Sequence, residues 1–241
     1  MRTSIIKKFL ISFILLTSSS LTIAVEMSAN IGITSNYVFR GRTQTQDQAA
    51  ISGGLDYEYG NGFYAGTWMS NVDIGGGGQT ELDIYGGYTG SFDEFEYNVG
   101  YAYYHYPEAK DLFGTGISFG EIYGSITYQW VTFGIYYIAN SQINDDPAND
   151  EIYIKGDLYY HFDGNWKLND DWTLTASVGK QLFGDDGVNG AEYNYNTFLF
   201  GFTKATKDKG DFTFSIAKSS HAIDLGNDDN LMPFISWKQY F

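Results

Sequence analysis

The feature that most constrains the fold is an alternation of apolar and polar residues that recurs in twelve separate segments of the chain. In one segment, Ile51, Leu55 and Tyr57 share one parity, whereas Asp56 and Glu58 share the other. Strand spacing places successive side chains on opposite faces of a sheet, while a helix would scatter the same apolar residues around its axis. The alternation therefore predicts an all-β fold whose strands each have one apolar and one polar face.

The expected strands are long enough to cross a lipid bilayer, because a tilted membrane strand needs only about 9–11 residues. Their number is even, as in the single-chain barrels of bacterial outer membranes. We expect the twelve strands at residues 29–42, 48–59, 63–73, 80–90, 94–106, 118–129, 131–140, 150–162, 172–183, 193–204, 211–222 and 231–241.

The connections between these segments alternate between long and short. Tight connections fall at residues 60–62, which carry an Asn-Gly hairpin signal, at 90–93 and around Trp130. The long ones are acidic and rich in Gly and Asn, and they fall at residues 43–47, 74–79, 107–117, 141–149, 184–192 and 223–230. Counting strands places every long loop at one end and both termini at the other. Outer-membrane barrels have this asymmetry, with short periplasmic turns and longer external loops. We predict a closed antiparallel transmembrane β-barrel as a single domain over residues 25–241.

The first 24 residues have the organisation of an export signal. Arg2, Lys7 and Lys8 form a basic start, an apolar core follows at residues 9–16, and small residues precede a cleavage point after Ala24. Cleavage after Ala29 is the alternative. The apolar core is too short for a membrane anchor. We therefore expect a signal peptide at residues 1–24 and residence in the outer membrane.

Composition excludes several other classes of protein. Removal of the signal takes three positive charges from a formal net charge of −15 and brings the mature chain to about −18. A nucleic-acid partner is not expected, because nucleic-acid binding requires a basic surface. The chain has no cysteine, which suits an oxidising export route. Beyond the signal no apolar run approaches the roughly 20 residues of a membrane helix, so a membrane crossing would have to use a barrel.

The polar faces of the strands carry charged residues that we expect to line the interior. A Lys or Arg on the lipid face costs about 2–4 kcal/mol at the bilayer midplane, so mid-strand charges should face inwards. The acidic majority would lower the energy of cations inside a narrow pore, which suggests weak cation selectivity. The candidate pore-lining residues are Arg40, Asp56, Glu58, Glu81, Asp83, Glu94, Glu96, Lys155 and Asp157.

We expect neither catalysis nor a bound cofactor or metal. The histidines are His105, His161 and His221, and only His221 has a serine, Ser219, that could pair with it along one strand face. A nucleophile and base also need an orienting third group, and none is identifiable. Oxygen-rich loops could attract hard cations, but none has the spacing of a twelve-residue calcium loop. These loops contain Asp145, Asp146, Asp185, Asp186, Asp224, Asp228 and Asp229.

Several blocks of the chain resemble a known family. They are residues 32–41 followed by Gln44, and then residues 53–59, 62–73, 81–88 and 99–104. Together they resemble the TorF family of porin-like proteins, catalogued earlier as a conserved hypothetical protein (Gcw_chp). The resemblance is most specific in the first half of the chain and follows the strand pattern in the second. It implies an outer-membrane barrel with a porin role, and it supplies no catalytic residues.

We therefore expect a barrel that lets ions or small polar solutes diffuse passively. The alternative is a non-conducting barrel with a structural or surface-binding role carried by its long acidic loops. The expected partners are outer-membrane lipids, lipopolysaccharide and the barrel-assembly machinery, which would recognise a last strand that ends on Phe241. Ile235 and Trp237 share the parity of that terminal residue, although Gln239 interrupts the series. Nothing in the sequence marks an oligomer interface.

Overall fold

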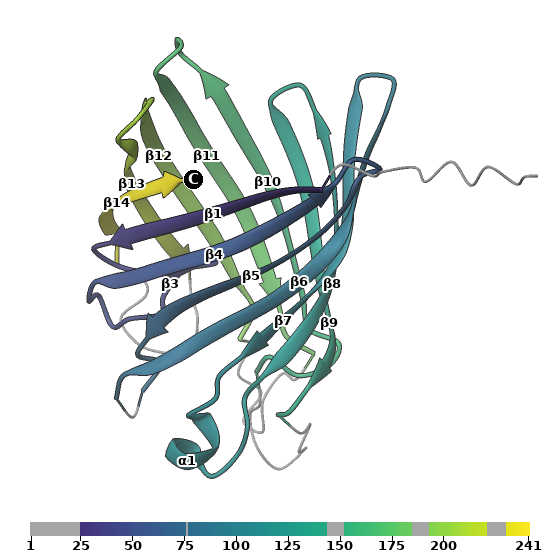
Figure 1. Cartoon of the computed structure of the whole chain (residues 1–241). Coiled ribbons are helices and arrows are strands. Elements are labelled where there is room, and N and C mark those ends of the chain that lie inside the picture. The colour runs from purple at the N-terminus through teal and green to yellow at the C-terminus, as the bar shows by residue number, and fades with distance from the viewer. Residues whose placement is uncertain (1–24, 76, 144–151, 185–192, 221–229) are drawn as a thin grey trace, which may run out of the picture.

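The computed structural model describes residues 25–75, 77–143, 152–184, 193–220 and 230–241, and these form one closed barrel (Figure 1). Twelve antiparallel strands build the wall, as predicted, and a separate two-stranded hairpin and a short helix lie in the connections. The elements are β1 (Val25–Thr34), β2 (Val38–Phe39), β3 (Arg42–Thr43), β4 (Ala50–Tyr59), β5 (Phe63–Val72), β6 (Gln79–Phe92), β7 (Phe95–His105), α1 (Ala109–Phe113), β8 (Phe119–Tyr128), β9 (Val131–Ser141), β10 (Leu158–Lys167), β11 (Trp172–Leu182), β12 (Tyr195–Thr206), β13 (Gly210–Ser220) and β14 (Met232–Tyr240).

Closure of the barrel depends on β1, which pairs with β4 on one side and with β14 on the other. Ile33 lies opposite Ile51 of β4 and opposite Trp237 of β14. The last residue also takes part, because Phe241 and Ala29 exchange backbone hydrogen bonds of 2.9 and 3.2 Å. Every wall strand therefore has two neighbours, and the sheet has no open edge.

The two faces of the wall differ in the way the alternation predicts. On β12 and β13, Phe198, Phe200 and Phe214 point outwards and are 45–46% exposed. Thr197 and Ser215 on the same strands point inwards and are 4% exposed. A contiguous exposed belt of large apolar side chains suits a lipid environment rather than water.

The first strand is shorter than expected. We predicted a strand over residues 29–42, but β1 ends at Thr34 and residues 35–49 leave the wall. Within this segment β2 and β3 pair as a small hairpin, with Phe39 opposite Arg42. The turn residues Arg40 and Gly41 have φ values of 47° and 74°. Two successive positive φ values define a tight hairpin turn that reverses the chain, so the strand cannot continue.

Two other predicted segments also differ from the structure. The strand expected over residues 150–162 begins only at Leu158, because Tyr153 and Gly156 adopt φ values of 60° and 111° that interrupt an extended chain. The loop after β7 contains α1, which the sequence did not indicate. No helix among the described residues is long and apolar enough to cross a membrane.

The buried core lies inside the half of the barrel that carries the long loops. It contains Val72, Tyr104, Tyr106, Phe119 and Ile138 on the inner wall, and all are at most 9% exposed. Tyr37 and Phe39 of the segment between β1 and β4 pack against this cluster. Protein side chains therefore occupy part of the interior of this half, which is not an open tube.

Candidate functional site: a hairpin inside the lumen

The segment between β1 and β4, residues 35–49, crosses the interior of the barrel. We call it the luminal hairpin. Near one wall, the ring of Tyr37 lies 5.4 Å from that of Trp68 on β5, and the ring of Phe39 lies 5.9 Å from that of Tyr104 on β7. At the other side, a Cβ placed on Gly41 would lie 3.2 Å from the carbonyl oxygen of Lys218 on β13. The hairpin therefore contacts strands on opposite sides of the lumen.

Arg40 at the tip of the luminal hairpin forms a buried ion pair with Glu121 of β8. Its Nη1 and Nη2 atoms donate to Oε1 and Oε2 at 2.8 and 2.7 Å, and the side chains are only 5% and 1% exposed. Nη1 also donates to Oε1 of Gln181 on β11 at 3.4 Å. Parallel double hydrogen bonds of this kind are strong and fix the guanidinium plane. They attach the hairpin tip to the wall.

Aromatic rings surround the same guanidinium. Its central carbon lies 4.6 Å from the ring centre of Phe39, 4.9 Å from that of Tyr136 and 4.4 Å from that of Tyr159. The negative faces of such rings stabilise a cation, most strongly where water is excluded. Arg40 therefore has both an anionic partner and an aromatic cage, which together offset the cost of burying its charge.

Glu121 was not among the predicted interior residues, although the sequence contains a signal for it. It shares parity with Tyr123 and Ser125, whereas Ile122 and Ile126 occupy the other parity and point outwards. A register shift between Gly120 and Glu121 locally disturbs the ladder to β9. Applying the parity rule to this strand would have identified the carboxylate, but not its partner.

A second acidic group lies on β6. Glu81 is 2% exposed and accepts hydrogen bonds from the hydroxyl groups of Tyr37, at 2.9 Å, and Tyr106, at 3.1 Å. Asp83, two residues further on the same inner face, is 9% exposed. Its Oδ1 atom has no hydrogen-bond partner among the described residues. A buried carboxylate oxygen without a donor is costly unless water or a cation satisfies it.

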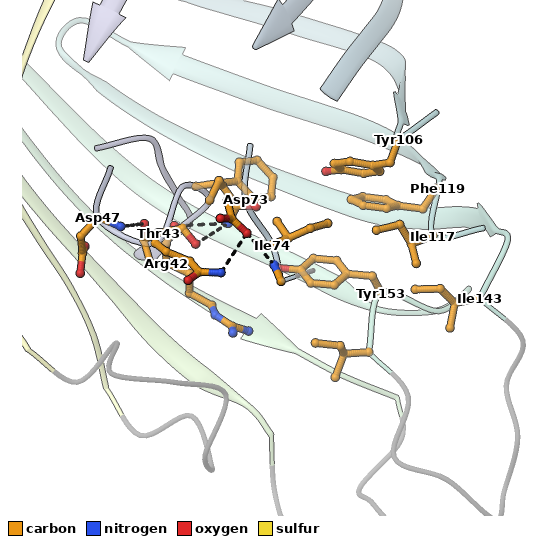
Figure 2. A pocket seen from close by; sticks show the side chains of 15 residues that line it. Arg42, Thr43, Asp47, Asp73, Ile74, Tyr106, Ile117, Phe119, Ile143 and Tyr153 are labelled. Atoms are coloured by element: carbon orange, nitrogen blue, oxygen red, sulfur yellow. Dashed lines mark hydrogen bonds between the residues drawn. The ribbon is translucent and has the colours of Figure 1, made fainter. Parts of the chain in front are cut away.

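The luminal hairpin lies between two cavities. The outer one, on the long-loop side, measures about 620 Å³ (Figure 2). Tyr106, Phe119 and Tyr153 form one side of it, and Arg42 and Asp73 lie on the other. The inner cavity measures about 220 Å³ and is lined by Arg40 and by mid-strand residues of the wall. Phe39 lines both cavities, so the hairpin forms the boundary between them.

The structure places six of the nine predicted pore-lining residues on the inner side. Glu81 and Asp83 lie beside the hairpin, and Arg40 lies on it rather than on a strand. Asp56 faces inwards and accepts a hydrogen bond from the hydroxyl of Tyr85. The other two, Glu58 and Glu96, share the inner parity of their strands and are exposed near the rim with the short turns.

The remaining three predicted residues do not lie on wall strands. Glu94 lies in the turn between β6 and β7, and Lys155 lies in the turn before β10, and both are exposed. Their assignment to strand faces was wrong because turn residues interrupt the alternation there. Asp157 is buried, but it also precedes β10 and accepts hydrogen bonds from the backbone amides of Ile154, at 3.0 Å, and Gly184, at 2.8 Å. Its carboxylate therefore holds two loops together.

The described histidines lie beside other polar groups without forming a catalytic arrangement. Nδ1 of His105 lies 3.1 Å from Oγ of Ser118, but that hydroxyl is buried and also accepts from the backbone amide of Tyr106. His161 and Ser177 both bind Asp163 rather than each other. No group of three potential metal ligands occurs among the described residues. His221 and the predicted oxygen-rich loops, with Asp145, Asp146, Asp185, Asp186, Asp224, Asp228 and Asp229, lie outside them.

A closed, even-numbered antiparallel barrel with an apolar outer face, a charged interior and an inward-folded loop has the fold of a porin-like barrel. The chain belongs to the family described as "Bacterial protein of unknown function (Gcw_chp)", whose family model matches residues 19–224. This match agrees with the resemblance seen in the sequence. Among curated proteins none matches the chain.

Solved structures with a similar fold include two porins. The KdgM porin aligns with a TM-score of 0.55 and 7% identity, over 89% of this chain and 98% of that one. The NanC porin aligns with a TM-score of 0.51 and 13% identity, over 89% and 98%. LpxR from Salmonella typhimurium also aligns, with a TM-score of 0.51 and 10% identity, over 89% and 99%. Identities this low show a shared fold and nothing more specific.

Proposed function

We propose that this protein is a passive, non-enzymatic outer-membrane channel for ions or small polar solutes, with weak cation selectivity set beside the luminal hairpin. The observation that carries the proposal is the balance of charge around the hairpin. Glu81, Asp83 and Glu121 lie beside the hairpin, which carries Arg40 and Arg42, and Glu121 already neutralises the charge of Arg40. When Glu81 and Asp83 are ionised, the net negative charge that remains lowers the energy of a cation in a narrow pore more than that of an anion.

The interior also restricts the kind of solute. A twelve-stranded barrel lies between small barrels filled by side chains and the wide pores of 16–18 strands. Here the hairpin narrows the passage further, and the inner cavity of about 220 Å³ suits ions and small solutes. The KdgM porin has been solved in complex with disordered oligogalacturonate. An acidic interior argues against a polyanion of that kind as the solute of this protein.

One observation favours a second candidate, the non-conducting barrel. The ion pair between Arg40 and Glu121 is almost completely buried, and Phe39 lies between the two cavities. If the hairpin never leaves this position, the barrel is closed and its role is structural or lies at its surface.

Recordings from planar bilayers separate the two candidates. The purified protein is reconstituted between KCl solutions that differ tenfold in concentration, and its conductance and reversal potential are measured. We expect discrete conductance steps and a reversal potential of the sign that marks K⁺ as the more permeant ion. Clear anion preference would contradict the selectivity. No conductance at any tested voltage, from protein that shows the heat-sensitive gel shift of a folded barrel, would favour the non-conducting barrel.

Two features support the proposed route to the outer membrane. β1 begins at Val25, and residues 25–29 pair with residues 55–59 of β4. Signal cleavage after Ala24 keeps this pairing, whereas cleavage after Ala29 would remove half of the strand. We also propose that the assembly machinery recognises the last strand, since the hydrogen bonds between Phe241 and Ala29 close the barrel at the periplasmic end.

A further inference from the structure

The outer face of the wall carries two lysines where the apolar belt ends. Lys180 on β11 and Lys218 on β13 each lie two residues from the long-loop end of their strands. Both share the outward parity of their strands, with Val178 49% exposed and Phe214 46% exposed. The next residues on the same strands, Gln181 and Ser219, point inwards and are fully buried. The side chains of both lysines therefore point away from the lumen, on the lipid side of the wall.

β12, the strand between the two strands that carry the lysines, adds polar side chains beside them. Lys180 lies directly opposite Asn196 of β12, and Asn196 lies directly opposite Ser220 of β13. Nδ2 of Asn196 donates to Oγ of Ser220 at 3.1 Å. Lys218 lies one outward position before Ser220, so all four side chains share one face of three adjacent strands. We call these four residues the rim patch.

No carboxylate balances the positive charge of the rim patch among the described residues. The outward positions of β11–β13 contain no Asp or Glu, and neither lysine forms an ion pair with a described residue. This is unusual in a chain with 29 acidic and 14 basic residues. Lys costs little on a barrel wall near the interface and much more at the midplane. The patch therefore fits the level of lipid headgroups rather than that of the hydrocarbon.

We propose that the rim patch binds the phosphate groups of lipid A, the phosphorylated glycolipid of the external leaflet. The long-loop end of an outer-membrane barrel faces outside, which places the rim patch in that leaflet. With strands about 4.8 Å apart and a rise of about 3.4 Å per residue, the Cα atoms of Lys180 and Lys218 lie roughly 12 Å apart. Two flexible ammonium groups at this spacing can contact the headgroup, while Asn196 and Ser220 offer polar groups between them. The acyl chains then lie on Phe198 and Val178 below.

A lipid-binding titration of the purified full-length barrel in detergent tests this site. The probes are bisphosphorylated lipid A, the same lipid with its phosphates removed, and inorganic phosphate. The variants are K180Q/K218Q, the charge-preserving K180R/K218R, and K204Q as a matched control. Lys204 is an outward lysine of β12 at the opposite rim, 5.3 Å from the ring centre of Trp172.

Each headgroup-level lysine contributes about 1 kcal/mol to binding an anionic lipid, so K180Q/K218Q should bind bisphosphorylated lipid A about 10- to 30-fold more weakly. K180R/K218R and K204Q should bind like the wild type, and the wild type should discriminate against the dephosphorylated lipid. Equal binding of both lipids, or unchanged binding by K180Q/K218Q, overturns the proposal. Inorganic phosphate that binds as tightly as lipid A also overturns it, because the ligand would then be a free anion. The heat-sensitive gel shift shows whether each variant is folded. If K180Q/K218Q does not fold, the single variants K180Q and K218Q are used instead. Loss of their discrimination between phosphorylated and dephosphorylated lipid A supports the proposal, and unchanged discrimination overturns it. None of these outcomes depends on conductance.

Discussion

Replacing Arg40 by alanine should release the luminal hairpin from the wall. The change leaves the Glu121 carboxylate, which is 1% exposed, without its bidentate partner. Removing one member of a buried ion pair costs about 3–5 kcal/mol, because the remaining charge stays buried and unpaired. Loss of the three ring contacts adds to this cost. The ratio of docked to undocked hairpin should therefore fall by roughly 10²- to 10⁴-fold, since about 1.4 kcal/mol corresponds to a factor of ten.

Two measurements follow the hairpin directly. Trypsin can cut after Arg42, a residue of β3 that R40A retains, and mass spectrometry identifies the released peptide of residues 25–42. Cleavage should be slow in the wild-type barrel and rapid in R40A. In planar bilayers the same variant should show larger or more frequent openings, because the boundary between the two cavities is removed.

The double variant R40A/E121A separates the charge from the packing. With both charges gone, no unpaired ion remains, so cleavage should fall between that of the wild type and that of R40A. E96Q alters an exposed carboxylate near the other rim and should match the wild type in both assays. If R40A were as resistant to trypsin as the wild type and conducted identically, the ion pair would not be what holds the hairpin in place.

Three further outcomes are expected. D83N should lower the cation-to-anion permeability ratio about twofold when the recordings are made at a pH at which the Asp83 carboxyl group is ionised, because one partly screened luminal charge is then lost. E94Q in an exposed turn should leave the ratio unchanged, and an equal effect of both variants would point to general surface charge. A hydrogen bond from the Thr80 amide, at 3.1 Å, lowers the pKa of Glu108 from its ordinary value of 4.5, so the stabilisation from this contact is fully present above that value and is lost as the pH falls through the lower folded pKa. The hydrogen-exchange protection factor of that amide should fall in acid, and E108Q should remove the pH dependence. Amino-terminal sequencing of protein isolated from outer membranes should begin at Val25, and any other start would place the cleavage site elsewhere.

Much of the wall was predictable from local pattern. The number of strands, their antiparallel order and the long-loop end follow from alternation and loop length, because both are repeated along the chain. The inward facing of Glu81 and Asp83 follows from parity alone. Errors occur where the alternation breaks, as at Glu94 and Lys155, since parity assigns a face only to a residue that belongs to a strand.

The candidate site was only partly visible in the sequence. Arg40 was expected inside the barrel, but as a strand residue among mainly acidic neighbours. Its partner Glu121 is 81 residues away in sequence, and no local pattern connects the two. Positive φ values at Arg40 and Gly41 turn the chain back on itself and make the pairing possible.

The alternation of apolar and polar residues determined a closed barrel in a membrane, because side chains on opposite faces of a strand must meet lipid on one side and the lumen on the other. Loop lengths predict its orientation. The tertiary structure alone decided what occupies the lumen. By sequence alone, residues 35–49 look like the end of a strand followed by a loop. They fold inwards because Glu121, Gln181 and the rings of Tyr136 and Tyr159, which belong to four different strands, all contact Arg40. Such convergence depends on barrel closure, which brings distant segments together, and no sequence period encodes it.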